Sequence, residues 1–526
     1  MKRLTAAFLT LLLLLCSTVA ALAEEAPIVI TVGRAVDANQ GYINGDTIDD
    51  NLWYREYSSQ LNIDVENEWT VMTSEYSTRL NLAIASGDIP DIIQLDNQTQ
   101  LRTLVEAEMV ADITDVYEEY ASEDTKAFMS GDGGNALDIC TYDGRLYALP
   151  NMNATVYNVS LLWIRQDWLD NLGLQAPETI EDVIEIARAF TYDDPDGNGA
   201  DDTYGLALSD ALFDGTTSLV GFFNGYHAYP DQWITLEDGS VAYGAIQPEA
   251  KEALTAVAEM YQDGLIDPDF AVKDTTKVSE EIQGRKFGMV FGRNWSGYNV
   301  GTTEDAWQGW SIMPAPSVDG TEAMYGVENS STGYYVISSE CEHPEALVQM
   351  MNMYVDIVYG DQTTGNDFIT AYTEDGERVG QSTLAVVQTL LPNLQTSHAL
   401  EQLVSAVEAR DAALLEGCLT ETDKFEPAVA YLDEKDMTYF GQYYQYVAFK
   451  VTVEEIGIDR LVETAFSGST ETMDEKWSIL EDYTREMYTK IIMGEESIDA
   501  FDTFVAEWNQ MGGAEITEEV NAVVAK

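Results

Sequence analysis

The sequence predicts an α/β protein of two domains, with mixed, mostly parallel sheets and helices on both sheet faces. Two observations predict this class. Over residues 28–95, segments rich in β-branched residues alternate with helical segments, which is the pattern of βαβ units. The chain has 526 residues. About 500 remain after a predicted leader, which is too many for one hydrophobic core.

The first domain is predicted from its strands and the stop signals between them. A strand ends at a glycine, and the first clear helix stops at Ser86-Gly87-Asp88, just before Pro90. The predicted elements are a strand at 28–33, a helix at 49–60, a strand at 63–71, a short helix at 78–85 and a strand at 91–95.

The second domain is predicted from the elements that follow. Thr179 is placed to cap a helix, with Asp182 where a capping box usually has Glu. Pro314 and Pro316 are interpreted as a return crossing to the first domain. The remaining predicted elements are a strand at 146–150 that leaves the first domain, strands at 286–291 and 334–338, and a largely helical C-terminal part.

The N-terminus has the layout of a secretory signal peptide. Lys2 and Arg3 precede an apolar run to about residue 15, and small residues in an A-x-A pattern lead to Glu24. We expect residues 1–23 to be removed by cleavage after Ala23. A retained membrane anchor is one alternative. Lipidation at Cys16 is another, although Leu15 is a large residue for that cleavage.

The charge balance excludes several classes of partner. Asp and Glu number 92 against 26 Lys and Arg, and the net charge is −66. Phosphate backbones and anionic membrane surfaces would be repelled, so we expect no nucleic-acid binding. The acidic surface favours solubility and disfavours strongly anionic ligands, because the few basic residues are scattered.

Cysteine and histidine are too sparse for a disulfide scaffold or a zinc site. Cys140, Cys341 and Cys418 remain after the leader, so one bridge is possible but its pairing is open. The three histidines are far apart, and no His/Cys cluster has zinc spacing.

One loop has the spacing of a calcium site. Its oxygen donors stand at positions one, three, five and nine, glycine stands at position six, and a backbone carbonyl serves position seven. Position twelve is Gly205, so the usual bidentate Glu is missing, and Thr203 or Asp201 could contribute instead. We expect a structural Ca²⁺, with an acidic surface turn as the alternative. The predicted ligands are Asp194, Asp196, Asn198, Ala200 and Asp202.

Catalytic motifs are absent from the sequence, whereas aromatic residues are abundant. There is no G-x-S-x-G elbow, H-E-x-x-H or P-loop, and with 92 acidic residues no carboxylate pair stands out. The chain has 10 Trp and 29 Tyr, whose rings could stack on sugar faces. Trp295 is the strongest candidate, because it follows a predicted strand between glycines; a core role is the alternative.

Five segments, in order, carry a resemblance to a known family. They resemble the extracellular solute-binding proteins of bacterial ABC importers, family 1, in the oligosaccharide-type group that includes alginate-binding proteins. The segments are LAIASGDIPDII (82–93), GRLYALP (144–150), WIRQDWLDNLG (163–173), DPDGNG (194–199), and the closing pieces IIMG (491–494), FDTFV (501–505) and WNQMGG (508–513).

The resemblance implies a type II periplasmic-binding-protein-like fold, in which two α/β lobes close around a ligand by a hinge motion. On this basis lobe 1 comprises residues 24–150 and 313–365, and lobe 2 comprises residues 151–312 and 366–526. The resemblance also implies ligand contacts, by position, from Asp96, Asn97, Asn151, Trp295, Tyr298, Glu328 and Asn329.

The function that the resemblance implies is that of a secreted substrate-binding component of an ABC transporter. It would capture a carbohydrate, specifically a neutral oligosaccharide, and deliver it to the membrane permease. It would act outside the cytoplasm as a monomer, and it would not be an enzyme. Three alternatives stay open: a receptor for a peptide or other polar solute, a secreted glycan-active enzyme, and a sensor subunit that signals to a membrane kinase.

Overall fold

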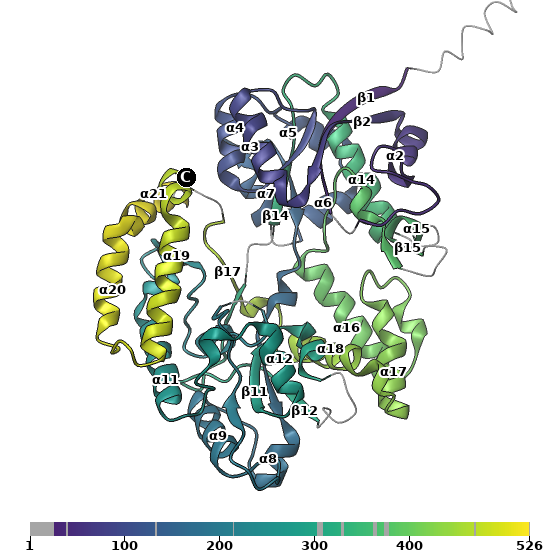
Figure 1. Cartoon of the computed structure of the whole chain (residues 1–526). Helices are drawn as coiled ribbons and strands as arrows, with labels where there is room; N and C mark the ends of the chain where they lie inside the picture. Colours follow the sequence, from purple (N-terminus) through teal and green to yellow (C-terminus); the bar gives the residue numbers. More distant parts are fainter. Residues whose placement is uncertain are drawn as a thin grey trace, which may run out of the picture.

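The chain folds into two α/β lobes, one above the other, joined by several chain crossings (Figure 1). We call them the N-terminal lobe and the C-terminal lobe. This computed structural model describes residues 26–37, 40–131, 134–213, 215–301, 309–327, 331–360, 366–372, 378–467 and 470–524. The predicted leader, residues 1–23, lies outside the described residues.

The N-terminal lobe is built on a five-stranded sheet. Its strands are ordered β2 (Ile63–Met72), β1 (Ile28–Val36), β3 (Ile92–Leu95), β14 (Ser331–Ile337) and β6 (Leu149–Met152). The helices of this lobe are α2 (Leu52–Glu56), α3 (Tyr76–Ser86), α4 (Gln98–Glu106), α5 (Thr114–Tyr120), α6 (Glu123–Met129), α7 (Asn135–Ile139), α14 (Glu345–Tyr359) and α15 (Asn366–Ile369).

The C-terminal lobe is built on a four-stranded sheet and carries most of the helices. The strand order is β12 (Trp310–Met313), β7 (Leu161–Arg165), β11 (Phe287–Gly292) and β8 (Tyr204–Leu206). Its helices are α8 (Gln166–Leu172), α9 (Ile180–Tyr192), α10 (Val220–Asn224), α11 (Pro248–Gln262), α12 (Thr275–Gln283), α13 (Gly297–Val300), α16 (Asn393–Ala409), α17 (Phe425–Glu434), α18 (Phe440–Val451), α19 (Glu471–Ile492), α20 (Ala500–Trp508) and α21 (Ala514–Val524).

Short paired strands complete the architecture. They are the pairs β4 (Thr141–Tyr142) with β5 (Arg145–Leu146), β9 (Trp233–Thr235) with β10 (Val241–Tyr243), β13 (Tyr325–Val327) with β17 (Leu461–Glu463), and β15 (Thr370–Tyr372) with β16 (Arg378–Gly380). None of the described helices is long and apolar enough to cross a bilayer.

Local sequence signals explain the predicted elements that the structure contains. The α3 helix stops at Gly87, whose positive φ of 72° suits the end of a helix. The α9 helix begins with a capping box in which the Thr179 side chain accepts from the Asp182 backbone and Asp182 accepts in return. The predictions of α/β lobes and of mixed sheets are confirmed. Parallel pairing is less frequent than expected, since only β1–β2, β1–β3 and β8–β11 are parallel in the two main sheets.

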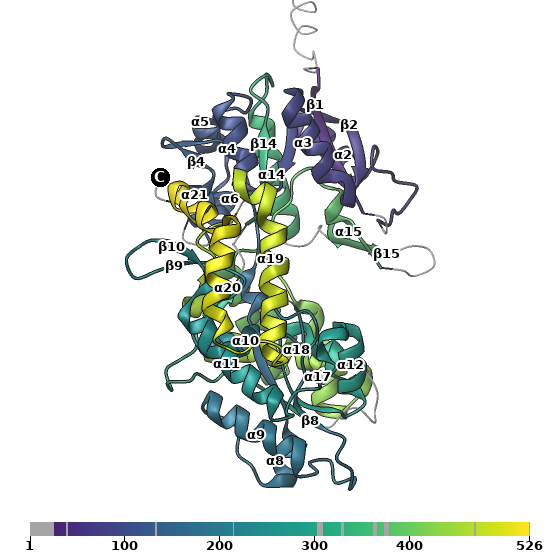
Figure 2. The same ribbon diagram turned by 60° about the vertical axis from the view of Figure 1, so that its left-hand side comes forward.

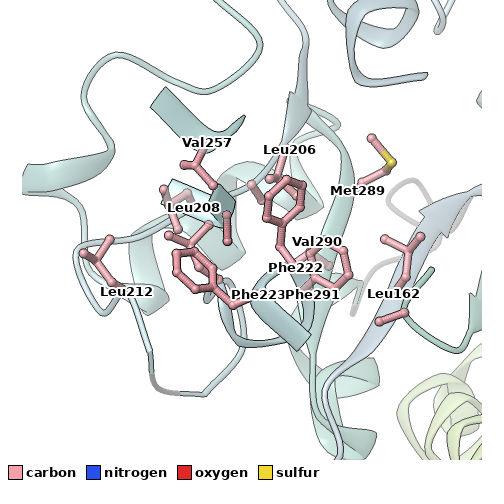
Figure 3. Packing of buried hydrophobic residues seen from close by; sticks show 14 of the residues in the cluster. Leu162, Leu206, Leu208, Leu212, Phe222, Phe223, Val257, Met289, Val290 and Phe291 are labelled. Atoms are coloured by element: carbon pink, nitrogen blue, oxygen red, sulfur yellow. The ribbon is translucent and has the colours of Figure 1, made fainter. Parts of the chain in front are cut away.

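Each lobe has its own hydrophobic core. The C-terminal core fills the space beside the four-stranded sheet with large side chains from strands and helices (Figure 3). Trp163, Trp168 and Trp508 are fully buried within it. The N-terminal core contains Cys140, and none of Cys140, Cys341 and Cys418 forms a disulfide within the described part of the chain.

The chain passes between the lobes at positions that differ from those predicted. The first crossing lies between Met152, in the N-terminal core, and Val159, in the C-terminal core. The predicted return at residue 313 is too early, because β12 pairs with β7 and Tyr325 packs in the C-terminal core. Pro314 and Pro316 therefore belong to a turn inside that lobe, where the Ser317 carbonyl accepts from the Ile180 amide.

The last crossing also lies later than predicted. Leu384 to Leu391 pack in the N-terminal core, so the chain leaves that lobe just before α16, not at residue 365. This crossing is bonded to the first one. The Asn393 Oδ1 accepts from the Val156 amide at 2.8 Å, and its Nδ2 donates to Thr155 at 2.8 Å. These two segments form the bonded part of the hinge.

Candidate functional site

A cavity of about 480 Å³ lies between the two lobes. The C-terminal helices close one side of the space between the lobes. Both views show α19 and α21 rising from their own lobe to the level of the N-terminal lobe (Figures 1 and 2). We call this space the interlobe cavity. It is lined by Asp96, Ser331, Thr332 and Tyr334 of the N-terminal lobe, and by Asp231, Gln232, Trp233, Thr464, Phe466, Ser467, Met473, Trp477 and Glu481 of the C-terminal lobe.

Aromatic rings supply the apolar part of the interlobe cavity. Trp477 projects from α19 and is half-buried, whereas Trp233 behind it is 5 % exposed. The two rings are stacked at 5.7 Å between centroids, and Tyr243 meets Trp477 edge-on at 5.0 Å. A flat ring held in this way offers an ordered surface for the apolar face of a ligand.

Carboxylates supply the charge of the interlobe cavity. Asp96, Asp231 and Glu481 line it, and none of the described lining residues is Lys, Arg or His. Burial raises the pKa of Glu481 above its usual range, although a hydrogen bond from the Trp477 side chain one turn earlier on α19 opposes this shift. The cavity therefore suits a ligand that donates hydrogen bonds and carries no negative charge there.

A buried amide adds a further polar group. Gln232 is 5 % exposed and lines the cavity, and its Nε2 donates to the Val327 carbonyl at 2.8 Å. Its Oε1 is buried and accepts no hydrogen bond from the described residues. An unsatisfied acceptor of this kind costs stability unless a ligand or water donates to it.

A second cavity, of about 340 Å³, opens in the N-terminal lobe at the ends of β1 and β3. We call it the N-lobe cavity. Asp96 lines both cavities, so the two are neighbours along one face of the lobe. The Ser77 hydroxyl donates to Asp96 at 2.7 Å and orients its carboxylate. The N-lobe cavity is lined by Val32, Gly33, Arg34, Ala35, Thr73, Tyr76, Ser77, Ile92, Ile93, Gln94, Asp96, Tyr335, Thr383, Val386 and Gln388.

Of the ligand-contact residues predicted in the N-terminal lobe, one lines the interlobe cavity and two do not. Asp96 faces the interlobe cavity. Asn97 does not line it and instead caps α4, its side chain accepting from the Gln100 amide at 3.0 Å. Asn151 lies on β6 next to the cavity-lining Thr332, whose hydroxyl is 3.5 Å from the Asn151 carbonyl. Glu328 and Asn329 lie outside the described residues.

The predicted aromatic pair lies near the hinge, away from the lining of the interlobe cavity. Trp295 follows β11 and is half-buried, with the Arg293 guanidinium 5.3 Å from its ring. Tyr298 donates to Gln445 at 3.1 Å, and Gln445 donates to Asn294. Asn294 in turn donates to the carbonyl of Tyr157, which belongs to the first crossing. This chain of bonds ties the Trp295 segment to the hinge.

The sequence interpretation missed the C-terminal-lobe side of the cavity. Trp477 and Glu481 are four residues apart, which places them on one face of α19. A tryptophan within a run of charged residues on a helix is a usable signal, because such a ring is costly to leave exposed without a purpose. Asp231 and Gln232 carry no comparable signal, since they lie in a short connection before β9.

The candidate calcium loop brings its predicted donors close together, but they do not surround one metal position. The Asn198 amide nitrogen donates to Asp196 at 2.9 Å and to Asp202 at 3.2 Å, as a cation would bridge them. Asp194 accepts from the Gly199 amide. Within the described residues no three His, Cys, Asp or Glu side chains converge on a metal position.

At the end of this loop, Thr203 offers no further ligand, and Asp201 remains the other candidate. The Thr203 hydroxyl is buried and donates to the Phe190 carbonyl at 2.7 Å, so it is not available as the extra donor we considered. A side chain at Gly205 would meet Ala187 at 2.4 Å, which leaves no room for a bidentate Glu. The donor types still fit calcium, with three carboxylates, one amide and the Ala200 carbonyl, and water would complete the coordination.

Comparisons with known proteins agree with this architecture. A curated relative, the polygalacturonan/rhamnogalacturonan-binding protein YtcQ of Bacillus subtilis (strain 168), is 25 % identical over 475 residues, covering 88 % of this chain and 86 % of its own. A solved extracellular solute-binding protein from Bifidobacterium longum subsp. infantis has a TM-score of 0.63 at 17 % identity, covering 96 % and 99 %. The Streptococcus pneumoniae substrate-binding protein FusA in complex with kestose has a TM-score of 0.57 at 17 % identity, covering 94 % and 99 %.

The family itself follows from a match over more than half of the chain. The sequence profile described as bacterial extracellular solute-binding protein matches residues 50–356, which include the first crossing, the whole four-stranded sheet and every strand of the five-stranded sheet except β1. Together with the two lobes and the cavity between them, this shows that the chain belongs to the bacterial extracellular solute-binding protein family.

Proposed function

We propose that this chain captures an oligosaccharide between its lobes and delivers it to the permease of an ABC importer. The observation that carries the proposal is the interlobe cavity, which Trp477 lines together with carboxylates from both lobes and, among its described lining residues, no cation. Sugar rings combine an apolar face with hydroxyl donors, and this pairing of groups recognises both. The units that occupy this cavity are neutral, because its carboxylates would repel an acidic group.

The relatives support this proposal. FusA is named as a fructooligosaccharide ABC transporter substrate-binding protein, and YtcQ is named as a polygalacturonan/rhamnogalacturonan-binding protein. The chain acts outside the cytoplasm as a binding protein, not as an enzyme, and functions as a monomer. Cleavage after Ala23 releases it, and the permease reads its closed form.

Ligand-dependent stabilisation tests the proposed function. A panel of neutral oligosaccharides, pentapeptides and amino acids is to be screened by thermal unfolding, because a ligand stabilises the form that it binds. We expect at least one oligosaccharide to raise the melting temperature and to be recovered intact after incubation. Stabilisation by peptides alone, or hydrolysis of the sugar, would contradict the proposal.

We further propose that the loop at Asp194 binds a structural Ca²⁺. Removal of calcium with EGTA is expected to lower the melting temperature by several degrees, as for a ligand that binds only the folded state. Asp196→Ala should have the same lowered melting temperature with and without EGTA. Asp193→Ala is the control that keeps the response, since Asp193 is an exposed neighbour outside the donor set. An identical melting curve of the wild type in EGTA would remove the metal from the loop.

A further inference from the structure

Arg34 differs from the other buried charged side chains of the described residues. Four such side chains are at most 8 % exposed, namely Arg34, Arg165, Asp267 and Arg460. Three of them have a partner of opposite charge: Arg165 pairs with Asp167, Arg460 with Glu322, and Asp267 with Lys273 and Lys286. Arg34 is 7 % exposed, and no carboxylate of the described residues lies within 4.0 Å of it.

The Arg34 guanidinium has hydrogen-bond acceptors, but none of them neutralises its positive charge. Its guanidinium donates to the Tyr54 hydroxyl at 3.3 Å, to the Leu384 carbonyl at 3.2 Å and to the Thr383 carbonyl at 3.0 Å. All three acceptors are uncharged. A buried cation without a counter-ion is costly in free energy, and a bound anion would offset that cost.

Arg34 also lines the N-lobe cavity, where a ligand can reach it. The cavity lies at the carboxyl ends of the parallel strands β1 and β3, which is where open α/β sheets bind ligands. Apart from the carboxylate of Asp96, the other polar side chains that line it are neutral, namely Thr73, Tyr76, Ser77, Gln94, Tyr335, Thr383 and Gln388. The guanidinium is therefore the only described cation that lines this cavity.

We propose that the N-lobe cavity binds the carboxylate of a single acidic sugar unit, through a charge-assisted contact with Arg34. This inference rests on the proposed function, because the rest of the same oligosaccharide extends past Asp96 into the interlobe cavity. Asp96 lines both spaces, and its charge opposes any acidic unit beyond the first. The substrate class is thus an oligosaccharide that is neutral at the aromatic rings and acidic at one end.

Matched pairs of sugars test this inference. Each neutral oligosaccharide of the panel is to be compared with the same oligosaccharide whose terminal C6 hydroxymethyl group is oxidised to a carboxylate, and both Kd values measured by calorimetry at pH 7. For the best pair we expect the acidic form to bind about tenfold more tightly, the contribution of one hydrogen bond to a charged group. Equal or weaker binding of every acidic form would overturn the inference.

Three variants separate recognition from folding. Arg34→Gln should abolish the preference for the acid while the neutral form binds within about threefold of the wild type. Asp96→Asn should increase the preference for the acidic form, because it removes a negative charge that repels the sugar carboxylate. Arg79→Gln removes the same charge from the surface of α3, where the guanidinium lies over Trp69, and should change neither Kd.

The outcomes distinguish this inference from the proposed function. If neutral sugars bind and the acidic forms gain nothing, only the inference fails. If no sugar of either kind binds, both fail. Should Arg34→Gln not fold, Asp96→Asn still decides, and an unchanged preference in that variant contradicts the inference.

Discussion

Replacing Trp477 with alanine is expected to weaken oligosaccharide binding by about 30-fold, which corresponds to roughly 2 kcal/mol at a central aromatic contact. The Trp477 ring is held in a fixed orientation by its neighbours, so its surface is preorganised to stack on a sugar ring. Trp233 stacks behind it and Tyr243 supports its edge, so little side-chain entropy is lost on binding. Calorimetry with the most stabilising oligosaccharide measures the effect.

The controls for this prediction separate ring contact from loss of folding. Trp477→Phe keeps a flat ring and should bind within about threefold of the wild type. Trp295→Ala tests the ring predicted from the sequence. Because Trp295 does not line the interlobe cavity, we expect this variant to bind within about threefold of the wild type, and a tenfold loss would return the ring to the site. An unchanged affinity in a folded Trp477→Ala protein would remove this ring from the binding surface.

Local patterns in the sequence predicted the N-terminal lobe well for a physical reason. The strands β1, β2 and β3 contain several β-branched residues, and the end of a buried strand points to the site. Asp96 follows such a strand and does line the cavity. Thr179 and Asp182 similarly fix a helix start by bonds between near neighbours.

The other side of the site depends on long-range packing, which no local pattern records. Trp477 and Asp96 line the same cavity only because α19, which begins at Glu471, rises to the level of the N-terminal lobe. The crossing points were misplaced for a related reason. Pro314 and Pro316 do mark a turn, but a turn inside a lobe and a turn between lobes have the same local chemistry.

Arg34 shows that a single buried charge can determine ligand preference more strongly than the net charge of the chain. With a net charge of −66, the sequence predicts that anionic ligands are disfavoured. That prediction averages over the surface, whereas the N-lobe cavity presents one buried guanidinium to a ligand. Local charge and burial therefore decide which groups this cavity accepts, and only the folded chain reveals them.

Substituting Asp167 with alanine is expected to destabilise the C-terminal lobe by about 3–5 kcal/mol, the usual cost of removing one partner of a buried ion pair. Asp167 accepts two hydrogen bonds from Arg165, at 2.9 and 2.7 Å. The Arg165 side chain is completely buried beside the rings of Trp168 and Trp310. Without Asp167 its charge has no partner in an apolar environment.

Thermal unfolding measures this loss, and we expect a fall in melting temperature of roughly 10 °C for the transition of the C-terminal lobe. Asp170→Ala is the matched control, because Asp170 is an exposed carboxylate on the same helix, bonded only to Gln166 in the described residues. The double variant Arg165→Met, Asp167→Ala removes the charge together with its partner and should recover most of the stability. If the double variant is no more stable than Asp167→Ala alone, the unpaired charge is not the cause, and the loss of Asp167 acts through the start of α8 instead.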